Sequence, residues 1–194
     1  MTEERTLMHH VVAFVTVAIW GSTFISTKLL IHAGLSPAQI FTLRFLIAYV
    51  LMLVVGLWGP RGLGGRRLLS DSWQDEACMM LLGITGGSAF FLFQNEALAF
   101  STATNVSLIV CSCPLFTMIL LRLFYADTSL GRWQVLGTVF SFVGMAVVVL
   151  NGQFVLNLSP LGDFLALCAC LAWAVYSLVI KRMNKRYNSF FITR

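Results

Sequence analysis

Three ionisable side chains lie within long apolar stretches of the sequence, where a charge is costly. Lys28 follows AIWGSTFIST, Arg44 lies within SPAQIFTLRFLIAYVLML, and Glu96 precedes ALAFSTA. A charged group at the centre of a bilayer costs about 2.5–3.5 kcal/mol on insertion scales, so it normally faces protein or water. The two bases could attract an anionic solute at the mouth of a pathway, with Glu96 as their charge partner. The alternatives are that Lys28 snorkels to the headgroups and that Glu96 is interfacial.

Aromatic and hydroxyl side chains share one face of the first apolar stretch. Phe24 and Lys28 are four positions apart, so they lie on the same side of a helix, with Trp20 and Thr23 beside them. This mixed face suits the lining of a cavity for an amphipathic solute, and packed or lipid-facing aromatic bulk is the alternative. Asn105 is a further polar candidate, with a helix-to-helix hydrogen bond as its alternative role.

Six stretches are long and apolar enough to cross a bilayer as helices. The 194 residues are 58% hydrophobic and 11% charged, with a mean hydropathy of +0.85, whereas soluble domains are about half apolar and a quarter charged. A membrane-spanning helix needs about 20 apolar residues. The expected spans are 11–31, 37–58, 77–97, 103–123, 133–150 and 160–180. The sequence therefore predicts an all-α integral membrane protein with about six transmembrane helices.

Lys and Arg residues are concentrated in alternate loops between these spans, and alternate loops lie on the same side of a membrane. The second loop contains Arg61, the fourth contains Arg132 and the tail contains Lys185, whereas segments 31–36 and 151–159 contain no Lys or Arg. This positive-inside pattern predicts a multi-pass protein of the cytoplasmic (inner) membrane with both termini in the cytoplasm. Nucleic acid is not an expected partner, because the bases are not gathered on a soluble face.

Pro114 lies inside the fourth span and cannot donate a hydrogen bond to the carbonyl of Val110. A kink is expected there, either as a hinge for alternating access or as a static bend. The two Cys-x-Cys pairs, at 111–113 and 168–170, point their thiols about 200° apart on a helix, so they predict apolar packing and no metal site. No cofactor is expected.

The motifs of common intramembrane or soluble enzymes are missing from the sequence. There is no G-x-S-x-G nucleophile elbow and no H-E-x-x-H zinc motif, and Asp163 is a lone interfacial acid where a protease dyad needs two. We therefore expect the protein not to be an enzyme.

A tryptophan and a lysine recur at a fixed offset near the two ends of the chain. Trp20 and Lys28 are repeated as Trp173 and Lys181, 153 positions later. The second copy lies five spans after the first, an odd number, so it crosses the membrane in the opposite direction. Such an inverted-topology repeat is typical of secondary transporters with a site at the repeat interface. Trp173 and Tyr176 would face the same cavity as Trp20, from the opposite repeat.

The order and spacing of five segments resemble the EamA-type transporters of the drug/metabolite transporter superfamily. These segments, which cover most of residues 13–182, are AIWGSTFISTKLL, SPAQIFTLRFLIAYVLML, EALAFSTATNVSLIVCSCPLFTMILLRLF, LGRWQVLGTVFSFVGMAVVVL and LGDFLALCACLAWAVYSLVIKR. The resemblance implies a ten-helix fold of two inverted five-helix repeats. Residues 1–10 would then be a short cytoplasmic N-terminus, 11–150 the first repeat, and 151–194 the start of the second, with one helix and a cytoplasmic tail.

The resemblance also implies a function. EamA-type proteins are secondary transporters or exporters that carry small metabolites, such as amino acids, sugars or drugs, by alternating access. The expected partners are the lipid bilayer, a small-molecule substrate, and either a missing second half or further copies of the chain. We expect an incomplete fragment of a transporter; a half-transporter that forms homo-oligomers, or a membrane interaction protein that transports nothing, is the alternative.

Overall fold

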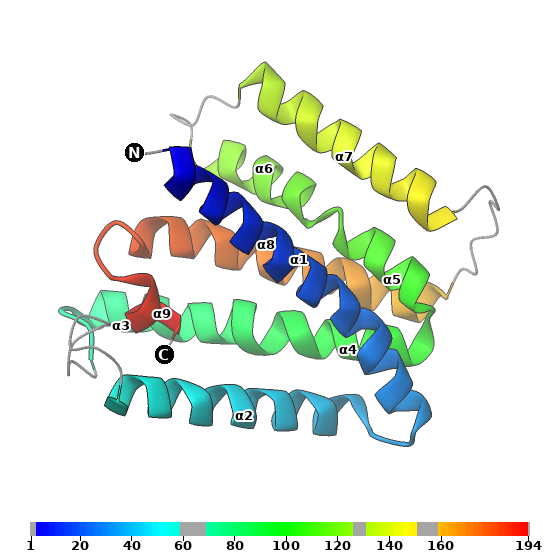
Figure 1. Ribbon diagram of the computed structural model, residues 1–194, viewed down its shortest axis with the longest axis horizontal. Helices are drawn as coiled ribbons and strands as arrows, with labels where there is room; N and C mark the ends of the chain where they lie inside the picture. Colours follow the sequence, from blue (N-terminus) through cyan, green and yellow to red (C-terminus); the bar gives the residue numbers. More distant parts are fainter. Residues whose placement is uncertain (1–2, 59–68, 126–130, 151–158, 194) are drawn as a thin grey trace.

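The structure is a computed structural model that describes residues 3–58, 69–125, 131–150 and 159–193, and every regular element in these ranges is a helix (Figure 1). The elements are α1 (Glu3–His32), α2 (Pro37–Trp58), α3 (Trp73–Leu82), the π-helix η1 (Gly83–Ala89), α4 (Phe90–Phe100), α5 (Ala103–Val110), α6 (Cys113–Phe124), α7 (Arg132–Leu150), α8 (Pro160–Met183) and α9 (Ser189–Thr193).

Five helical stretches of the described chain are long and apolar enough to cross a membrane. They are Leu7–His32, Pro37–Val55, Trp73–Phe100, Ala103–Phe124 and Pro160–Met183. The third joins α3, η1 and α4, and the fourth joins α5 and α6. The predicted fold class, an all-α multi-pass membrane protein, is confirmed. The remaining expected span, 133–150, is covered by the 19-residue helix α7.

Capping side chains explain where two of the helices begin. The hydroxyl of Ser72 accepts a hydrogen bond from the backbone N–H of Gln74, 3.1 Å away, so the third span starts earlier than the expected residue 77. Ser159 caps α8 in the same way, and Pro160 follows it at the first helical position, where a missing N–H is harmless. Gly34 closes the turn between α1 and α2 with φ 96°, a backbone conformation that strains other residues.

Helix α8 lies at the centre of the bundle. It packs most extensively against α4, and also against α5 and α6, while α1 crosses in front of it (Figure 1). Phe90 and Leu98 of α4 are fully buried together with Ala166, Ala169 and Ala174 of α8. The small alanine side chains let the two backbones approach closely, which is the usual basis of helix packing in membranes.

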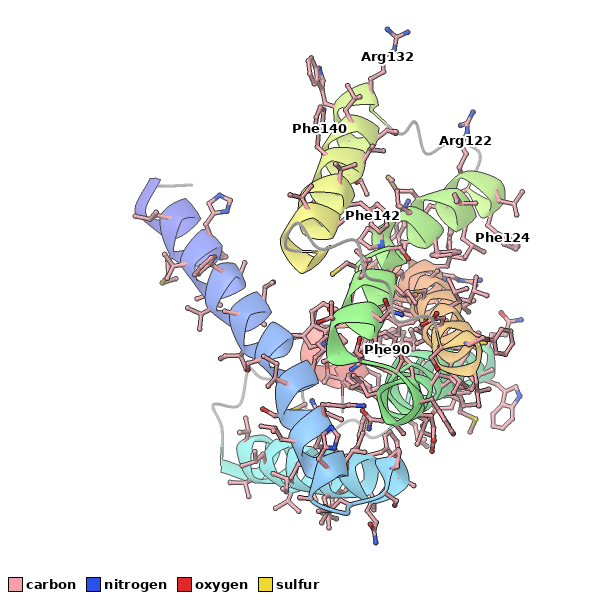
Figure 2. All side chains as sticks on the ribbon, turned by 90° about the vertical axis from the view of Figure 1, so that its right-hand side faces the viewer. Phe90, Arg122, Phe124, Arg132, Phe140 and Phe142 are labelled. Atoms are coloured by element: carbon pink, nitrogen blue, oxygen red, sulfur yellow. The ribbon has the colours of Figure 1, made fainter. Side chains whose placement is uncertain are left out.

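The outer helices present apolar side chains away from the bundle. Phe14 of α1 is 76% exposed and Phe140 of α7 is 74% exposed. Figure 2 shows Phe140 projecting outward from α7, whereas Phe90 lies among the packed helices. An apolar surface of this extent suits contact with lipid rather than with water.

The fourth span is broken, where the sequence predicts a kink. Helix α5 ends at Val110, α6 begins at Cys113, and Pro114 occupies the first turn of α6. The carbonyl of Ile109, at the break, accepts hydrogen bonds from the Ser112 hydroxyl at 2.5 Å and from the Cys170 thiol of α8 at 3.3 Å. The side chain of a neighbouring helix therefore satisfies a backbone group at the break.

Candidate functional site

An aromatic cluster joins α1, α4 and α8 in the middle of the molecule. The indole rings of Trp20 and Trp173 stack, with centroids 6.2 Å apart and an interplanar angle of 23°. Trp173 also contacts Phe90 at 4.8 Å and Tyr176 at 5.1 Å, and Trp20 contacts Phe24 at 6.3 Å. Trp173 is therefore the ring at which the contacts from the other two helices meet.

A cavity of about 670 Å³ lies beside this cluster, within the size range of small-molecule sites. Its walls come from α2, α3, η1, α4, α8 and α9. Six aromatic side chains line it: Phe45, Tyr49, Phe91, Trp173, Tyr176 and Phe191. Two methionines, Met79 and Met80, and one carboxylate, Glu76, complete the part of the wall that could bind a solute.

The π-helix η1 makes room for this cavity. Gly83, Gly86 and Gly87 of η1 all line it, and the ring of Tyr176 lies directly on Gly86. A Cβ atom at Gly86 would lie 2.6 Å from Cγ of Tyr176, far inside van der Waals contact. The G-x-x-x-G pattern at 83–87, which as a sequence signal predicts only close helix packing, therefore also shapes a wall of the cavity.

Glu76 is the one charged side chain among the described residues that line the cavity. Its Oε2 accepts hydrogen bonds from the backbone N–H of Ser70 at 3.0 Å and from the Ser70 hydroxyl at 2.5 Å. In the described chain, Oε1 accepts no hydrogen bond, and no Lys or Arg forms an ion pair with Glu76. One carboxylate oxygen is therefore available to a ligand.

A polar junction ties the chain after α8 to the start of α3. Nη1 of Arg186 lies 3.2 Å from both carboxylate oxygens of the buried Asp75, and the Tyr187 hydroxyl donates to Oδ2 of Asp75 at 3.0 Å. The backbone N–H of Asp71 donates to the same hydroxyl at 2.8 Å. The Tyr187 ring stacks on Phe191 of α9, with centroids 5.2 Å apart. These contacts hold α9 against the cavity.

Lys28, expected to bind an anionic solute, is engaged by backbone carbonyls. Its Nζ donates to the carbonyl oxygen of Leu98 at 2.6 Å and to that of Ser101 at 2.8 Å, at the C-terminal end of α4. A cation at this end of a helix satisfies free carbonyls and complements the helix dipole. Lys28 does not line the described cavity.

Arg44 and Glu96 do not form the expected charge cluster with Lys28. Nη1 of Arg44 donates to the Thr27 hydroxyl at 3.3 Å, and its guanidinium carbon lies 5.9 Å from the centre of the Phe91 ring. In the described structure, Glu96 makes no ion pair with either base. Arg44 thus contacts Phe91, a ring of the cavity wall, and is not itself among the described residues that line the cavity.

Of three further predicted residues, Phe24 and Asn105 are buried and Thr23 is half-buried. The Thr23 hydroxyl donates to the Trp20 carbonyl at 2.6 Å, and Phe24 is 7% exposed within the core. The side-chain amide of Asn105 donates to Oδ1 of Asp163 at 3.0 Å, which joins the starts of α5 and α8. Thus the predicted residues that line the cavity itself are Trp173 and Tyr176, and Trp20 stacks on Trp173 without lining the cavity.

Sequence reasoning missed Glu76 and the α2 side of the cavity. The expected third span starts at residue 77, one position after Glu76, so this carboxylate is read as part of a loop. Phe45 and Tyr49 carry no signal that separates them from lipid-facing aromatic residues. The four-residue spacing of Phe45 and Tyr49 indicates a shared helix face, which is the only pattern that could have suggested them.

Curated relatives match nearly the whole chain. An "Uncharacterized transporter" of Archaeoglobus fulgidus is 28% identical over 94% of this chain and 61% of its own length, and a second from the same organism is 26% identical over 92% and 59%. The "Uncharacterized transporter YcxC" of Bacillus subtilis is 26% identical over 97% of this chain and 58% of its own. The chain therefore spans about 60% of the length of these relatives.

No solved structure matches the chain significantly. The model of the EamA-like transporter family matches residues 7–150, about three quarters of the sequence, which includes Trp20 of the aromatic stack and most of the cavity lining. The chain belongs to the EamA-like transporter family.

Proposed function

We propose that the chain forms part of a secondary transporter that moves small organic solutes across the cytoplasmic membrane by alternating access. The observation that carries this proposal is the stack of Trp20 on Trp173 beside the cavity. These two residues are equivalent in the internal repeat. Symmetry-equivalent residues touch each other only close to the axis that relates the repeats, and inverted-repeat transporters bind their solutes at that interface.

The different surroundings of α1 and α8 support a transporter that contains more than the helices of this chain. Helix α8 is enclosed by α3 to α6, whereas its repeat counterpart α1 is exposed along most of its length. In the proposed unit, residues 11–150 are the first repeat and residues 151–194 begin the second. A second half, or another copy of the chain, then covers α1. Both termini lie in the cytoplasm in this arrangement.

The break in the fourth span supplies the proposed hinge. Pro114 is the second residue of α6, which starts after the two non-helical residues that follow α5, and hydrogen bonds from neighbouring side chains satisfy the carbonyl of Ile109 there. A rotation of α6 relative to α5 would leave the intrahelical bonds of both helices intact.

Reconstitution into lipid vesicles tests the proposal. The chain, alone and together with the remaining part of an EamA-like relative, would be assayed for entry of labelled amino acids, sugars and organic amines. At least one solute class should equilibrate faster than in empty vesicles, and Trp173→Ala should abolish the difference. If no class enters faster in either preparation, the chain is better explained as a membrane interaction protein that transports nothing.

A thiol-labelling experiment tests the orientation. A cysteine introduced at His32, the last residue of α1, should react with a membrane-impermeant reagent added outside intact cells, and one introduced at Lys185 should react only after the cells are opened. The reverse pattern would contradict the proposed placement of the termini.

A further inference from the structure

We infer that the cavity binds an organic cation with an aromatic body, such as an arylalkylamine. This inference rests on the proposed function, because it names the substrate class of the same cavity. It also differs from the expectation drawn from Lys28 and Arg44, which favours an anion. Three features of the described structure carry it: the placement of the charges, the composition of the walls, and the distance of the bases from the cavity.

The carboxylate of Glu76 gives the cavity a negative charge that no described base neutralises. The adjacent acid, Asp75, differs, because Arg186 and Tyr187 both contact it. Glu76 is held in place by Ser70 through one oxygen and keeps the other without a hydrogen bond in the described chain. An ammonium group at that oxygen would gain a charge-assisted hydrogen bond.

The walls of the cavity suit the body of the same ligand. Trp173, Tyr176, Phe91 and Tyr49 present ring faces or edges, and such rings attract both flat apolar groups and cations. The flexible side chains of Met79 and Met80 can adapt to different ring shapes. Six aromatic residues around one carboxylate favour an aromatic amine over a sugar, which needs many hydrogen-bonding groups.

The bases that would favour an anion are directed elsewhere. Both carbonyl contacts of Lys28 are at the end of α4, and Lys28 lines no part of the cavity. The guanidinium of Arg44 lies over the ring of Phe91, and Arg44 also does not line the cavity. Neither base is placed to bind a carboxylate inside the cavity.

A charge series with one ring system tests the inference directly. Tryptamine, 3-ethylindole and indole-3-propionate share the indole ring and are positive, neutral and negative at pH 7. Their binding to the purified chain in lipid nanodiscs would be measured by calorimetry, with empty nanodiscs as the blank. We expect tryptamine to bind about tenfold more tightly than indole-3-propionate, with 3-ethylindole between them, since a single charge contact near a protein surface can supply such a factor.

Variants of Glu76 identify the group responsible. Glu76→Gln keeps the shape and the hydrogen bond from Ser70 but removes the charge, so the tryptamine affinity should fall about tenfold while that of 3-ethylindole stays the same. Glu76→Asp should retain the preference for the cation. Glu96→Gln removes a carboxylate at the other end of the same span, outside the cavity lining, and should leave the affinities of tryptamine and 3-ethylindole unchanged.

Two results of the binding experiments would overturn the inference. One is that indole-3-propionate binds as tightly as tryptamine, and the other is that Glu76→Gln and Glu96→Gln leave the charge preference equally intact. Failure of the proposed function has a different signature, in which tryptamine binds with the expected dependence on Glu76 but crosses no vesicle membrane in either reconstituted preparation. Transport of another solute class without binding of tryptamine would overturn the cation inference alone.

Discussion

The indole rings of Trp20 and Trp173 stack at a centroid distance of 6.2 Å, although 153 positions separate the two residues in the chain. Trp20 belongs to α1 and Trp173 to the central helix α8. Their contact thus joins a peripheral helix to the core through two residues that share the same Trp-x7-Lys spacing.

A double-mutant cycle on this pair should show a favourable coupling. We expect Trp173→Ala to lower the free energy of unfolding by about 3 kcal/mol, and more than Trp20→Ala does, because Trp173 also contacts Phe90 and Tyr176. The coupling between the two changes should be about 0.5–1.5 kcal/mol, as for other aromatic pairs. Chemical denaturation in mixed micelles would measure it.

The control for the cycle is Trp133→Ala. Trp133 of α7 is 86% exposed, so its removal should change the free energy of unfolding by less than about 0.5 kcal/mol. Additive effects of the Trp20 and Trp173 changes, within about 0.3 kcal/mol, would mean that the two rings do not interact.

Replacement of Lys28 should affect stability rather than ligand charge preference. Lys28→Met keeps the apolar stem but leaves the carbonyls of Leu98 and Ser101 without their donor, and we expect a loss of about 2 kcal/mol. Hydrogen exchange should rise in the last turn of α4. Lys185→Met, at an exposed position after α8, is the matched control and should leave the free energy of unfolding unchanged. A Lys28→Met protein of unchanged stability that had lost affinity for indole-3-propionate would contradict this role.

The helices themselves were predictable, because the length and apolar character of a span are properties of a single segment. The expected spans 37–58 and 160–180 begin where α2 and α8 begin, and Ser159 with Pro160 marks the second of these starts by local chemistry alone. The break near Pro114 follows from the lack of one N–H in the residue itself.

The contacts of the charged side chains were not predictable in the same way. Lys28 binds backbone carbonyls, a group that every residue carries, so no pattern of residue types marks its partners. Glu76 becomes a cavity group only because residues of α2, α8 and α9 form other walls of the same cavity. No local sequence pattern indicates which helices are neighbours. The pairing of Trp20 with Trp173 is the exception, because each of them begins a Trp-x7-Lys spacing that is visible in the sequence.

Substitution of Gly86 tests the close contact between η1 and α8. We expect Gly86→Ala to lower the free energy of unfolding by about 1–3 kcal/mol, since its Cβ would lie 2.6 Å from Cγ of Tyr176. In the double variant Gly86→Ala/Tyr176→Ala, the loss of unfolding free energy should be smaller than the sum of the two single losses, because the clash is gone. Gly83→Ala meets no atom within 4 Å and should be neutral or slightly stabilising. Equal effects of the two glycine changes would show that the ring of Tyr176 does not rest on η1.

The buried side-chain amide of Gln94 in α4 should lower the stability of the fold. Its side chain is fully buried on the same helix face as Phe90 and Leu98, and neither its amide nitrogen nor its amide oxygen has a hydrogen-bond partner in the described structure. Gln94→Leu removes this unpaired group at similar size, and we expect it to raise the free energy of unfolding by about 1–3 kcal/mol. Gln74→Leu, at an exposed position of α3, should stay within about 0.5 kcal/mol.

The sign of the Gln94→Leu effect also distinguishes two arrangements of the chain in the membrane. A loss of stability would mean that the amide is hydrogen-bonded there, and a group outside the described residues would have to supply the partner. Co-reconstitution with the remaining part of a relative would then make the loss larger if that part provides the partner, whereas an unchanged loss would place the partner within the chain itself. A gain in stability together with slower solute transport would show instead that the unpaired amide serves the solute, since an inert polar group at that depth could only destabilise the fold.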